Sequence, residues 1–400
     1  MEASKTPEIR FKVFNAAWEQ RKLGDCGNTY GGLSAKTKED FGHGEARFVP
    51  YTNVFDNPIT DTNRLEAVEI DIKQNEVRRG DALFTVSSET PEEVGMSSVW
   101  LSDQRNVYLN SFCFGYRQDG SFDSNYLAYM LRSANVRADL TLLAQGISRF
   151  NISKNKVMEL EVPCPTIDEQ RQVGSFLRQL DNLITLHQRK CDKLVKLKSA
   201  MLNKMFPKFG ETEPEIRFAG CNDPWEQRKF SDLTDRVSIQ SSDSDLPQVE
   251  YEDIISGEGT LNKDLRDKEG GKTGIKFYAG DVLYGKLRPY LMNWLYPQFN
   301  GVAVGDFWVL RATECDSSFL YRLIQTDSFQ RLANVSSGSK MPRADWNLIS
   351  QSFFAVPADH AEQKAIAKSL AELDNLITLH QRKLERLRRL KTAMLDKMFV

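Results

Sequence analysis

Apolar residues recur at alternating steps of three and four along two long stretches of the chain. The first stretch begins near Thr166 and the second near Asp359, and each continues for about 40 residues. This spacing predicts two amphipathic helices whose apolar stripes pack against another helix, as in a coiled coil. Each stretch opens with an acceptor side chain followed three residues later by Glu169 or Glu362, which resembles a capping box.

The side chains expected in the two stripes occupy equivalent positions, and we expect them to form the coiled coil or to dock a partner. They are Leu180, Leu183, His187, Leu194 and Leu197 in the first helix, and Leu373, Leu376, His380, Leu384 and Leu387 in the second. The two histidines are interpreted as a polar layer that fixes the register of the helices. A pH switch or a ligand role is the alternative interpretation.

The two predicted helices are copies of each other. The string LDNLITLHQRK at 180–190 recurs unchanged at 373–383, which is 193 residues later. The opening of each half recurs as well, as PEIRF followed by WEQRK at Pro7–Lys22 and again at Pro214–Lys229. A repeat of this kind predicts two similar structural units. The ends of the copies stayed alike while their middles diverged, which indicates a shared scaffold that presents two different surfaces.

Short apolar alternations between the helices predict strands, and segments that begin with Asp predict short helices. We expect strands at 47–51, 81–86, 108–116, 160–165, 282–287, 307–310 and 353–357, and helices over 123–134 and from Asp316. The predicted fold class is mixed α/β or α+β, with two similar globular domains separated by two long antiparallel helices and related by an internal pseudo-twofold duplication. The predicted boundaries are 1–165 and 207–357 for the domains, and 166–206 and 358–400 for the helices.

Composition limits the chemistry that the chain can carry. The net charge is −2, so a DNA-binding surface must come from local basic patches or from a partner subunit. The six cysteines and four histidines show no spacing typical of a zinc site or a catalytic triad. Neither a P-loop nor a dinucleotide-binding motif is present. We therefore expect no catalytic residues, no metal and no cofactor in this chain.

The sequence also predicts a cytoplasmic protein. Scattered cysteines are typical of a reducing compartment. No apolar run approaches the length of a membrane span, and the first residues lack the layout of a signal peptide.

Basic residues are concentrated in the second half of each predicted helix, at 189–198 and 382–391. A solvated helix face with cations near the C-terminus explains most of them. Contact with phosphate or with a partner protein is the alternative.

Three segments are candidates for DNA contact, two loops because they mix small donors with one or two cations, and a third segment because it combines basic and aromatic residues. They are the 145–153 loop of the first copy, the 285–291 segment of the second copy and the 336–343 loop of the second copy. The candidate residues are Ser148, Arg149, Asn151, Lys286, Arg288, Tyr290, Ser339, Lys340 and Arg343. Ordinary surface loops or a solvent-facing strand edge are the alternative.

Two divergent domains, each followed by a nearly identical long helix, resemble the specificity (S) subunit of a type I restriction-modification system. The resemblance covers essentially the whole chain. Its most specific parts are VPCPTIDEQR at 162–171, AVPADHAEQK at 355–364 and the two LDNLITLHQRK strings. The second copy lacks the P-x-P spacing of the first copy at Pro357, and this difference concerns only the loop.

The resemblance implies that each domain is a target recognition domain for one half of a bipartite double-stranded DNA sequence. It also implies that the helices measure the spacer between the two halves. The S subunit would bind two methyltransferase (M) subunits, which methylate adenine with S-adenosylmethionine, and two ATP- and Mg²⁺-dependent translocase-nuclease (R) subunits. A helical adaptor with two protein-binding domains is the competing hypothesis, and a salt-dependent affinity for DNA would separate the two.

Overall fold

The computed structural model describes residues 6–265, 270–335 and 341–399 and divides the chain into two compact units. The first unit comprises Met1–Gln188 with Arg382–Val400, and the second comprises Arg189–Gln381. The two dividing points are equivalent in the repeat, since Gln188 and Gln381 are 193 residues apart. Each unit therefore contains one mixed domain, the beginning of the long helix that follows it and the end of the other long helix.

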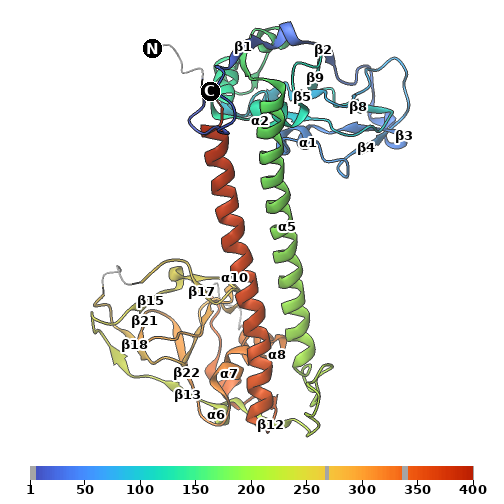
Figure 1. The fold of residues 1–400 in the computed structure, drawn as a ribbon. Coiled ribbons are helices and arrows are strands. Elements are labelled where there is room, and N and C mark those ends of the chain that lie inside the picture. Colours follow the sequence, from blue (N-terminus) through green and yellow to red (C-terminus); the bar gives the residue numbers. More distant parts are fainter. Residues whose placement is uncertain (1–5, 266–269, 336–340, 400) are drawn as a thin grey trace. The chain divides into compact units, whose positions relative to one another are not determined.

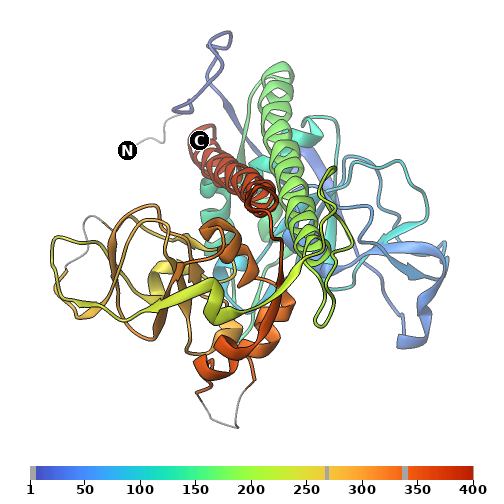
Figure 2. The ribbon, with the colours of Figure 1, turned by 90° about the horizontal axis from the view of Figure 1, so that it is seen from below.

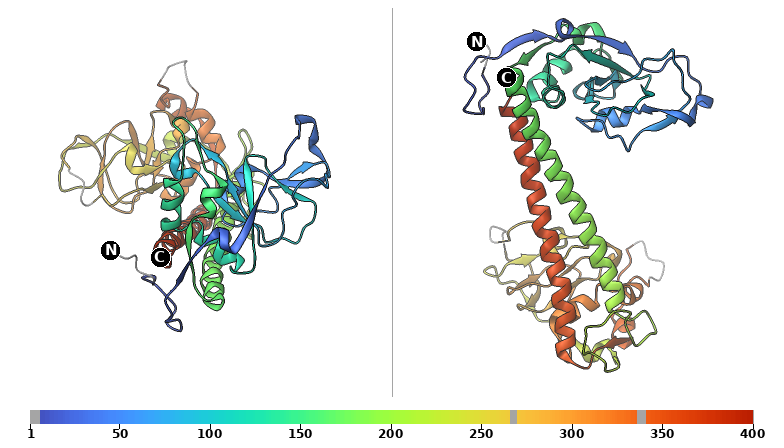
Figure 3. Two further views of the ribbon diagram at one scale, coloured as in Figure 1. Left: turned by 90° about the horizontal axis from the view of Figure 1, so that it is seen from above. Right: turned by 45° about the vertical axis from the view of Figure 1, so that its right-hand side comes forward.

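The domain of the first unit mixes short helices and strands. Its elements are β1 (Glu19–Lys22), β2 (Gly27–Gly31), β3 (Phe41–Val49), α1 (Tyr51–Asp56), β4 (Glu66–Val68), β5 (Ala82–Thr85), β6 (Ser87–Ser88), β7 (Ser97–Val99), β8 (Val107–Leu109), β9 (Cys113–Gln118), α2 (Ser124–Met130), α3 (Ala134–Leu142), β10 (Phe150–Asn151), α4 (Lys154–Met158) and β11 (Glu161–Cys164). The strands β2, β5 and β9 lie near α2, whereas β3 and β4 form the part of this unit farthest from the long helices (Figures 1 and 3).

The domain of the second unit repeats this plan with changes. Its elements are β12 (Glu226–Lys229), α6 (Phe230–Leu233), β13 (Thr234–Val237), β14 (Gln240–Ser241), β15 (Gln248–Val249), β16 (Ile254–Ile255), β17 (Thr260–Leu261), β18 (Gly274–Phe277), β19 (Val282–Gly285), β20 (Trp294–Leu295), β21 (Gly301–Ala303), β22 (Phe307–Ala312), α7 (Ser317–Leu323), α8 (Asp327–Ala333), α9 (Trp346–Gln351) and β23 (Phe353–Val356). Figure 2 shows the chain leaving the first long helix and continuing into these strands.

Each unit contains one sheet whose topology is the same in both units and a second sheet whose topology differs. The common sheet is antiparallel and four-stranded, with the order β2-β9-β5-β7 in the first unit and β13-β22-β19-β20 in the second. Its register is also shared, because Ala82 lies opposite Tyr116 as Val282 lies opposite Leu310. A second sheet has the order β4-β3-β8 in one unit and β14-β18-β21-β15 in the other, and the other strands form two-stranded pairs. The divergence predicted for the middles of the copies is therefore located in this second sheet.

The expected fold class is confirmed, and the differences from the expected elements have local causes. The segment 108–116 is two strands, because Asn110 accepts a hydrogen bond from the Phe112 amide and turns the chain between β8 and β9. The helix expected over 123–134 ends at Met130, and α3 begins at Ala134. Asp123 and Asp316 cap α2 and α7 as expected, each accepting from two backbone amides.

The Gly-Asp pairs at 80–81 and 280–281 form tight turns before β5 and β19. Both glycines have positive φ angles of 91° and 90°, which cost least without a Cβ atom. Each Asp is buried and forms an ion pair across the sheet, Asp81 with Arg117 at 2.7 Å and Asp281 with Arg311 at 2.8 Å. Each turn is thus fixed to its sheet by a charge-assisted hydrogen bond.

The long helices α5 (Ile167–Met205) and α10 (His360–Lys397) contain 39 and 38 residues. In the first unit, Asp181 forms an ion pair with Lys391 at 2.6 Å, and Gln188 accepts a hydrogen bond from Arg388 at 3.1 Å. The residue numbers rise along α5 as they fall along α10, so the helices are antiparallel within this unit. In the second unit Lys198 forms the equivalent ion pair with Asp374 at 2.6 Å.

The stripe that packs between the helices differs in part from the predicted one. Leu180 and Leu384 are buried, Leu373 and Leu387 pack against the domain cores, and Leu194, His187 and His380 are half-buried. In contrast, Leu183, Leu197 and Leu376 are exposed, so assigning them to the coiled-coil contact was wrong. The packed stripe instead includes Leu177, Cys191, Leu370 and Ile377. Leucines at 183, 186 and 197 form a second stripe on α5, and the sequence pattern alone did not separate the two.

Candidate nucleic-acid interface

Each domain is attached to the long helices by the same set of contacts, which we call the joint. In the first unit the Phe399 ring, just after α10, packs edge-on against Trp18 with ring centroids 6.5 Å apart. In the second unit the Phe206 ring, just after α5, packs against Trp225 at 6.1 Å. Edge-to-face pairs of buried aromatic rings stabilise such a contact beyond the area that they bury.

The joint also contains a buried ion pair in each unit. The Glu169 carboxylate accepts from the Arg10 guanidinium at 2.6 and 2.8 Å, and Glu362 accepts from Arg217 at 2.9 and 2.8 Å. Both glutamates are almost fully buried. The predicted capping box is thus replaced, because these carboxylates bind arginines from the opening segment of each repeat. Hydrogen bonding to Glu169 raises the pKa of Arg10, and hydrogen bonding to Glu362 raises that of Arg217.

Two equivalent aspartates have different partners in the two joints. Asp181 on α5 accepts a hydrogen bond from the Tyr129 hydroxyl at 2.8 Å, whereas Asp374 on α10 pairs with the buried Arg322 guanidinium at 2.6 Å. Apart from this exchange of tyrosine for arginine, both domains are held by the same chemistry. The two joints therefore share most of their side chains.

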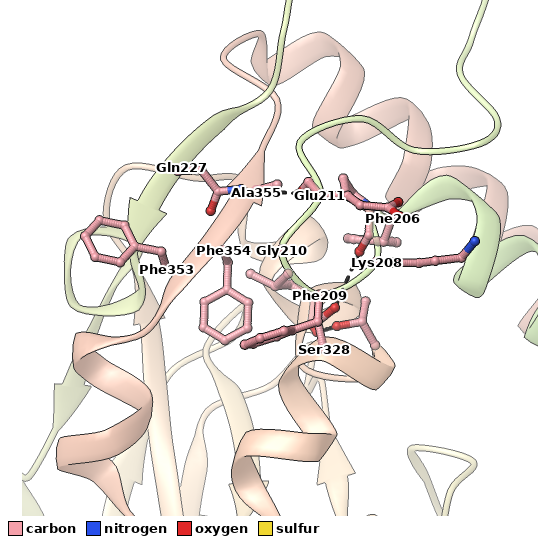
Figure 4. A pocket seen from close by; sticks show the side chains of 13 residues that line it. Phe206, Lys208, Phe209, Gly210, Glu211, Gln227, Ser328, Phe353, Phe354 and Ala355 are labelled. Carbon is pink, nitrogen blue, oxygen red and sulfur yellow. Dashed lines mark hydrogen bonds between the residues drawn. The ribbon is translucent and has the colours of Figure 1, made fainter.

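A small cavity marks where the chain leaves α5 in the second unit (Figure 4). Phe206, Phe209 and Phe354 help to line it, and its volume is about 30 Å³, room for about one water molecule. An adjoining surface hollow of about 440 Å³ extends over Leu202 and Arg331. These spaces lie at the joint and are packing features of it.

The candidate DNA-contact residues lie at equivalent places in the two domains. In the first unit, β10 pairs with β6, so that Asn151 lies opposite Ser87, and the Ile152 amide donates to the Val86 carbonyl. In the second unit Arg343 lies opposite Leu287, and the Ala344 amide donates to the Lys286 carbonyl. We call 86–88 with 150–152 the first paired segment, and 286–288 with 342–344 the second paired segment.

A tyrosine hydroxyl forms a hydrogen bond with the backbone of each paired segment. The Tyr51 hydroxyl donates to the Ser87 carbonyl at 2.6 Å, and the Tyr251 hydroxyl accepts from the Leu287 amide at 3.2 Å and donates to the Asp306 carbonyl. Burial raises the pKa of both hydroxyls, so both remain protonated and able to donate at neutral pH. A buried or half-buried tyrosine therefore holds each segment, through a carbonyl in the first and through an amide in the second.

The surface of the second paired segment is a cluster of charges. Arg343 and Lys286 converge on the Asp306 carboxylate, at 2.9 and 3.5 Å. Both cations line a cleft of about 550 Å³ together with Arg236, Trp308 and Trp346. The Arg236 guanidinium lies over the Trp346 ring, 4.9 Å from its centroid. Sequence reasoning missed Arg236, Asp306 and Trp346 because no local pattern links them to this segment.

Arg288 and Tyr290 lie on a tight turn beside that cleft. Arg288 has a φ of 50° directly before a proline, and Met292 has a φ of 52°. Such conformations are rare outside glycine and cost about 1–3 kcal/mol each. Among the described residues, the buried Arg288 Nε has no hydrogen-bond partner. The turn exposes Tyr290 to solvent. The predicted contacts Ser339 and Lys340 lie outside the described residues.

The surface of the first paired segment is different. Ser148, Arg149 and Asn151 are all exposed, as the prediction requires. The Phe112 carbonyl accepts from the Val86 amide as the Asp306 carbonyl accepts from the Lys286 amide, so Phe112 occupies the place of Asp306. The Phe112 side chain is exposed. Where the second unit places a Lys–Asp–Arg cluster, the first therefore places Val86, Phe112 and Asn151.

The described parts of the chain offer little support for a metal site, a membrane-spanning helix or a reactive thiol. No group of three or more His, Cys, Asp or Glu side chains is placed to hold a metal ion there. No helix in the described ranges is long and apolar enough to span a bilayer. Burial raises the pKa of the Cys113 and Cys315 thiols to about 12, which keeps them protonated and poorly nucleophilic.

Taken together, the chain has a duplicated scaffold of two domains on long helices, with one distinct exposed surface on each copy. It belongs to the family of type I restriction modification DNA specificity domains, whose model matches residues 15–196 and 222–389. The chain therefore carries two target recognition domains of the kind that type I restriction-modification systems use.

Relatives of known description agree with this assignment. The chain is similar to the putative type I restriction enzyme MjaX specificity subunit of Methanocaldococcus jannaschii, with 25% identity over 282 residues, 68% of this chain and 61% of the relative. It is also similar to the MjaVIII specificity subunit of that organism, with 22% identity over 297 residues, 68% of this chain and 69% of the relative. The chain thus spans less than two thirds of the MjaX subunit.

Solved structures share the fold. The type I restriction-modification S subunit from M. genitalium has a TM-score of 0.62 at 14% identity, and the match covers 99% of both chains. A structure concerning complex assembly and conformational transition of the type I R-M system has a TM-score of 0.53 at 17% identity, and covers 95% of this chain and 97% of that one.

Proposed function

We propose that this chain is the DNA specificity subunit of a type I restriction-modification complex and that each domain reads one half of a bipartite DNA sequence. One observation carries this proposal. The joints use the same side chains in both copies, while the paired segments at equivalent places expose different ones. Two readers on one scaffold are what an asymmetric bipartite target requires, because base contacts specify sequence and a shared scaffold does not.

The long helices are proposed to set the spacer between the half-sites. Each is a single unbroken helix of nearly 40 residues, about 60 Å at 1.5 Å per residue. Inserting four residues, about one turn, into both helices after Gln188 and Gln381 should change the tolerated spacer and leave the bases of both half-sites unchanged. An unchanged spacer, or altered half-site bases, would contradict this part of the proposal.

The helices are also proposed to dock two identical methyltransferase subunits. Leu183 and Leu186 on α5 are 42% and 46% exposed, and their counterparts Leu376 and Leu379 on α10 are 43% and 47% exposed. Exposed leucines three apart on a helix are typical of a surface that binds a partner helix or groove. Two equal surfaces on a repeated chain suit two copies of one partner.

Catalysis is assigned to the partners in this proposal. The methyltransferase subunits would methylate adenine with S-adenosylmethionine, and two translocase-nuclease subunits would supply ATP- and Mg²⁺-dependent restriction. This chain would contribute sequence recognition and assembly.

Profiling of methylated adenines in the host genome tests the function directly. Deletion of this chain should abolish methylation at one bipartite sequence, and a plasmid copy should restore it. A plasmid copy with Arg343→Ala and Lys286→Ala should relax or weaken one half-site only. A methylation pattern that is unaffected by the deletion would overturn the proposal.

A further inference from the structure

The first paired segment ends in a loop with an unusual apolar tip. Ile147 is 96% exposed, and it lies between β10 and the end of α3. Burying a side chain of this size is favourable, so Ile147 is available for contact with a binding partner.

The loop is held in a defined shape. Gln145 and Asn151 exchange two backbone hydrogen bonds, both 2.9 Å long, which close the loop at its base. Gly146 has a φ of 145°, and a Cβ atom there would lie 2.0 Å from the Arg149 carbonyl oxygen. The chain can therefore make this turn only with glycine at 146, and the turn presents Ile147 outward.

The charges that follow the tip along the chain favour a polyanion as the binding partner. Arg149, Lys154 and Lys156 are exposed, and no hydrogen bond or ion pair joins their side chains to other described residues. The segment 146–158 contains no Asp or Glu. Cations that follow an apolar side chain along the same segment suit the phosphates and the stacked bases of DNA.

We propose that Ile147 is a wedge that inserts between two base pairs of the half-site read by the first domain. Apolar side chains flanked by cations unstack base steps and kink the duplex when they enter it. Flexible pyrimidine–purine steps unstack with the least cost, so the wedge would add a preference for such a step without a hydrogen bond to it. In the second unit, Lys286, Arg343 and Asp306 make a polar surface at the paired segment. This inference rests on the proposed function.

Fluorescence of 2-aminopurine tests the wedge. The full chain is assembled with its methyltransferase partner and mixed with duplexes of the methylated sequence that carry 2-aminopurine at successive positions. Unstacking raises the fluorescence, and base flipping at the methylated adenine raises it independently. We expect one further responsive step in one half-site. Ile147→Ala should abolish that response, leave the response at the methylated adenine in place and weaken binding about tenfold. Ile147→Leu should restore it.

Ile72 provides the matched control. It is 94% exposed in the same unit and is flanked by Asp71 and Lys73. Ile72→Ala should leave both the fluorescence and the affinity unchanged. If the wild-type complex binds DNA but no further step responds, or if the response survives Ile147→Ala, the wedge is wrong while the proposed function stands. Loss of a co-purifying subunit in Ile147→Ala, without a change in fluorescence, would also overturn the wedge. Absence of DNA binding by the wild-type complex would reject the proposed function itself.

Discussion

The joints and the paired segments differ in what the two copies of the repeat share. At the joints, Trp18 with Phe399 matches Trp225 with Phe206, and Arg10 with Glu169 matches Arg217 with Glu362. At the paired segments the backbone hydrogen bonds match, but Phe112 in one copy takes the place of Asp306 in the other. The copies therefore share the side chains that attach each domain, whereas the proposed reading surfaces share only their backbone.

The largest expected effect comes from breaking a joint in one copy at a time. Phe206→Ala should destabilise the second unit by about 3–5 kcal/mol, because it removes a buried ring and leaves a cavity. Phe399→Ala should do the same to the first unit. Hydrogen exchange of each unit measures this, and each variant should lower protection in its own unit first. Equal loss in both units for either single variant would contradict the assignment of the two rings to separate joints.

A smaller effect is expected from removing Asp374 or Asp181, the equivalent carboxylates whose partners differ between the two joints. Asp374→Ala should destabilise the second unit by about 3 kcal/mol, because the buried Arg322 guanidinium loses its carboxylate. Asp181→Ala should cost about 1–2 kcal/mol, because its partner at the same place is the neutral Tyr129 hydroxyl. Each variant also removes the carboxylate that faces Lys198 or Lys391, so that loss is common to both. Denaturant unfolding followed in each unit measures the two losses of stability. A larger loss for Asp181→Ala than for Asp374→Ala would contradict this prediction.

The exposed leucines should affect assembly without affecting stability. Leu183→Lys should leave the unfolding free energy within about 0.5 kcal/mol of wild type, as is usual for exposed positions. It should nevertheless reduce the methyltransferase bound per chain from two copies to one. Leu376→Lys should act equally on the other copy, and the double variant should bind none. Mass measurement of the purified complexes gives the stoichiometry, and two bound copies in the double variant would remove these leucines from the docking surface.

The smallest expected effect concerns the charge cluster of the second paired segment. Asp306→Asn should free Arg343 and Lys286 to bind phosphate, so DNA affinity at low salt should rise a few-fold. The dependence of log affinity on log salt should become steeper by about one unit for each additional phosphate that the protein binds. Phe112→Asn at the equivalent place in the first unit removes no charge and should leave the salt dependence unchanged. A flat response in Asp306→Asn would mean that this cluster does not face the phosphate backbone.

The sequence predicted features that depend on neighbours in the chain better than those that depend on distant partners. The duplication, the long helices and the Asp caps were all predicted, because each is encoded in continuous stretches of the sequence. The packed stripe was only partly predicted, because α5 carries leucines on two faces and only contact with α10 decides which face is buried. Lys198 belongs to the packed face only because Asp374 lies opposite it.

The candidate surfaces show the same limit. Lys286 and Arg343 were identified separately, and their convergence on Asp306 required the pairing of two segments more than 50 residues apart. Arg236 and Trp346 carried no local signal that distinguished them from other surface residues. The exposed Ile147 was not singled out either, since an apolar residue in a polar loop is as often buried as exposed.

The division of the chain into units has a consequence for biosynthesis. The second unit is one continuous stretch, Arg189–Gln381, so it can complete its contacts as soon as that stretch leaves the ribosome. The first unit needs Arg382–Val400 as well, and its Ile9 amide hydrogen-bonds to the Lys397 carbonyl across nearly the whole chain. The domain that is translated first is therefore completed last, and until then Trp18 lacks the Phe399 ring that packs against it.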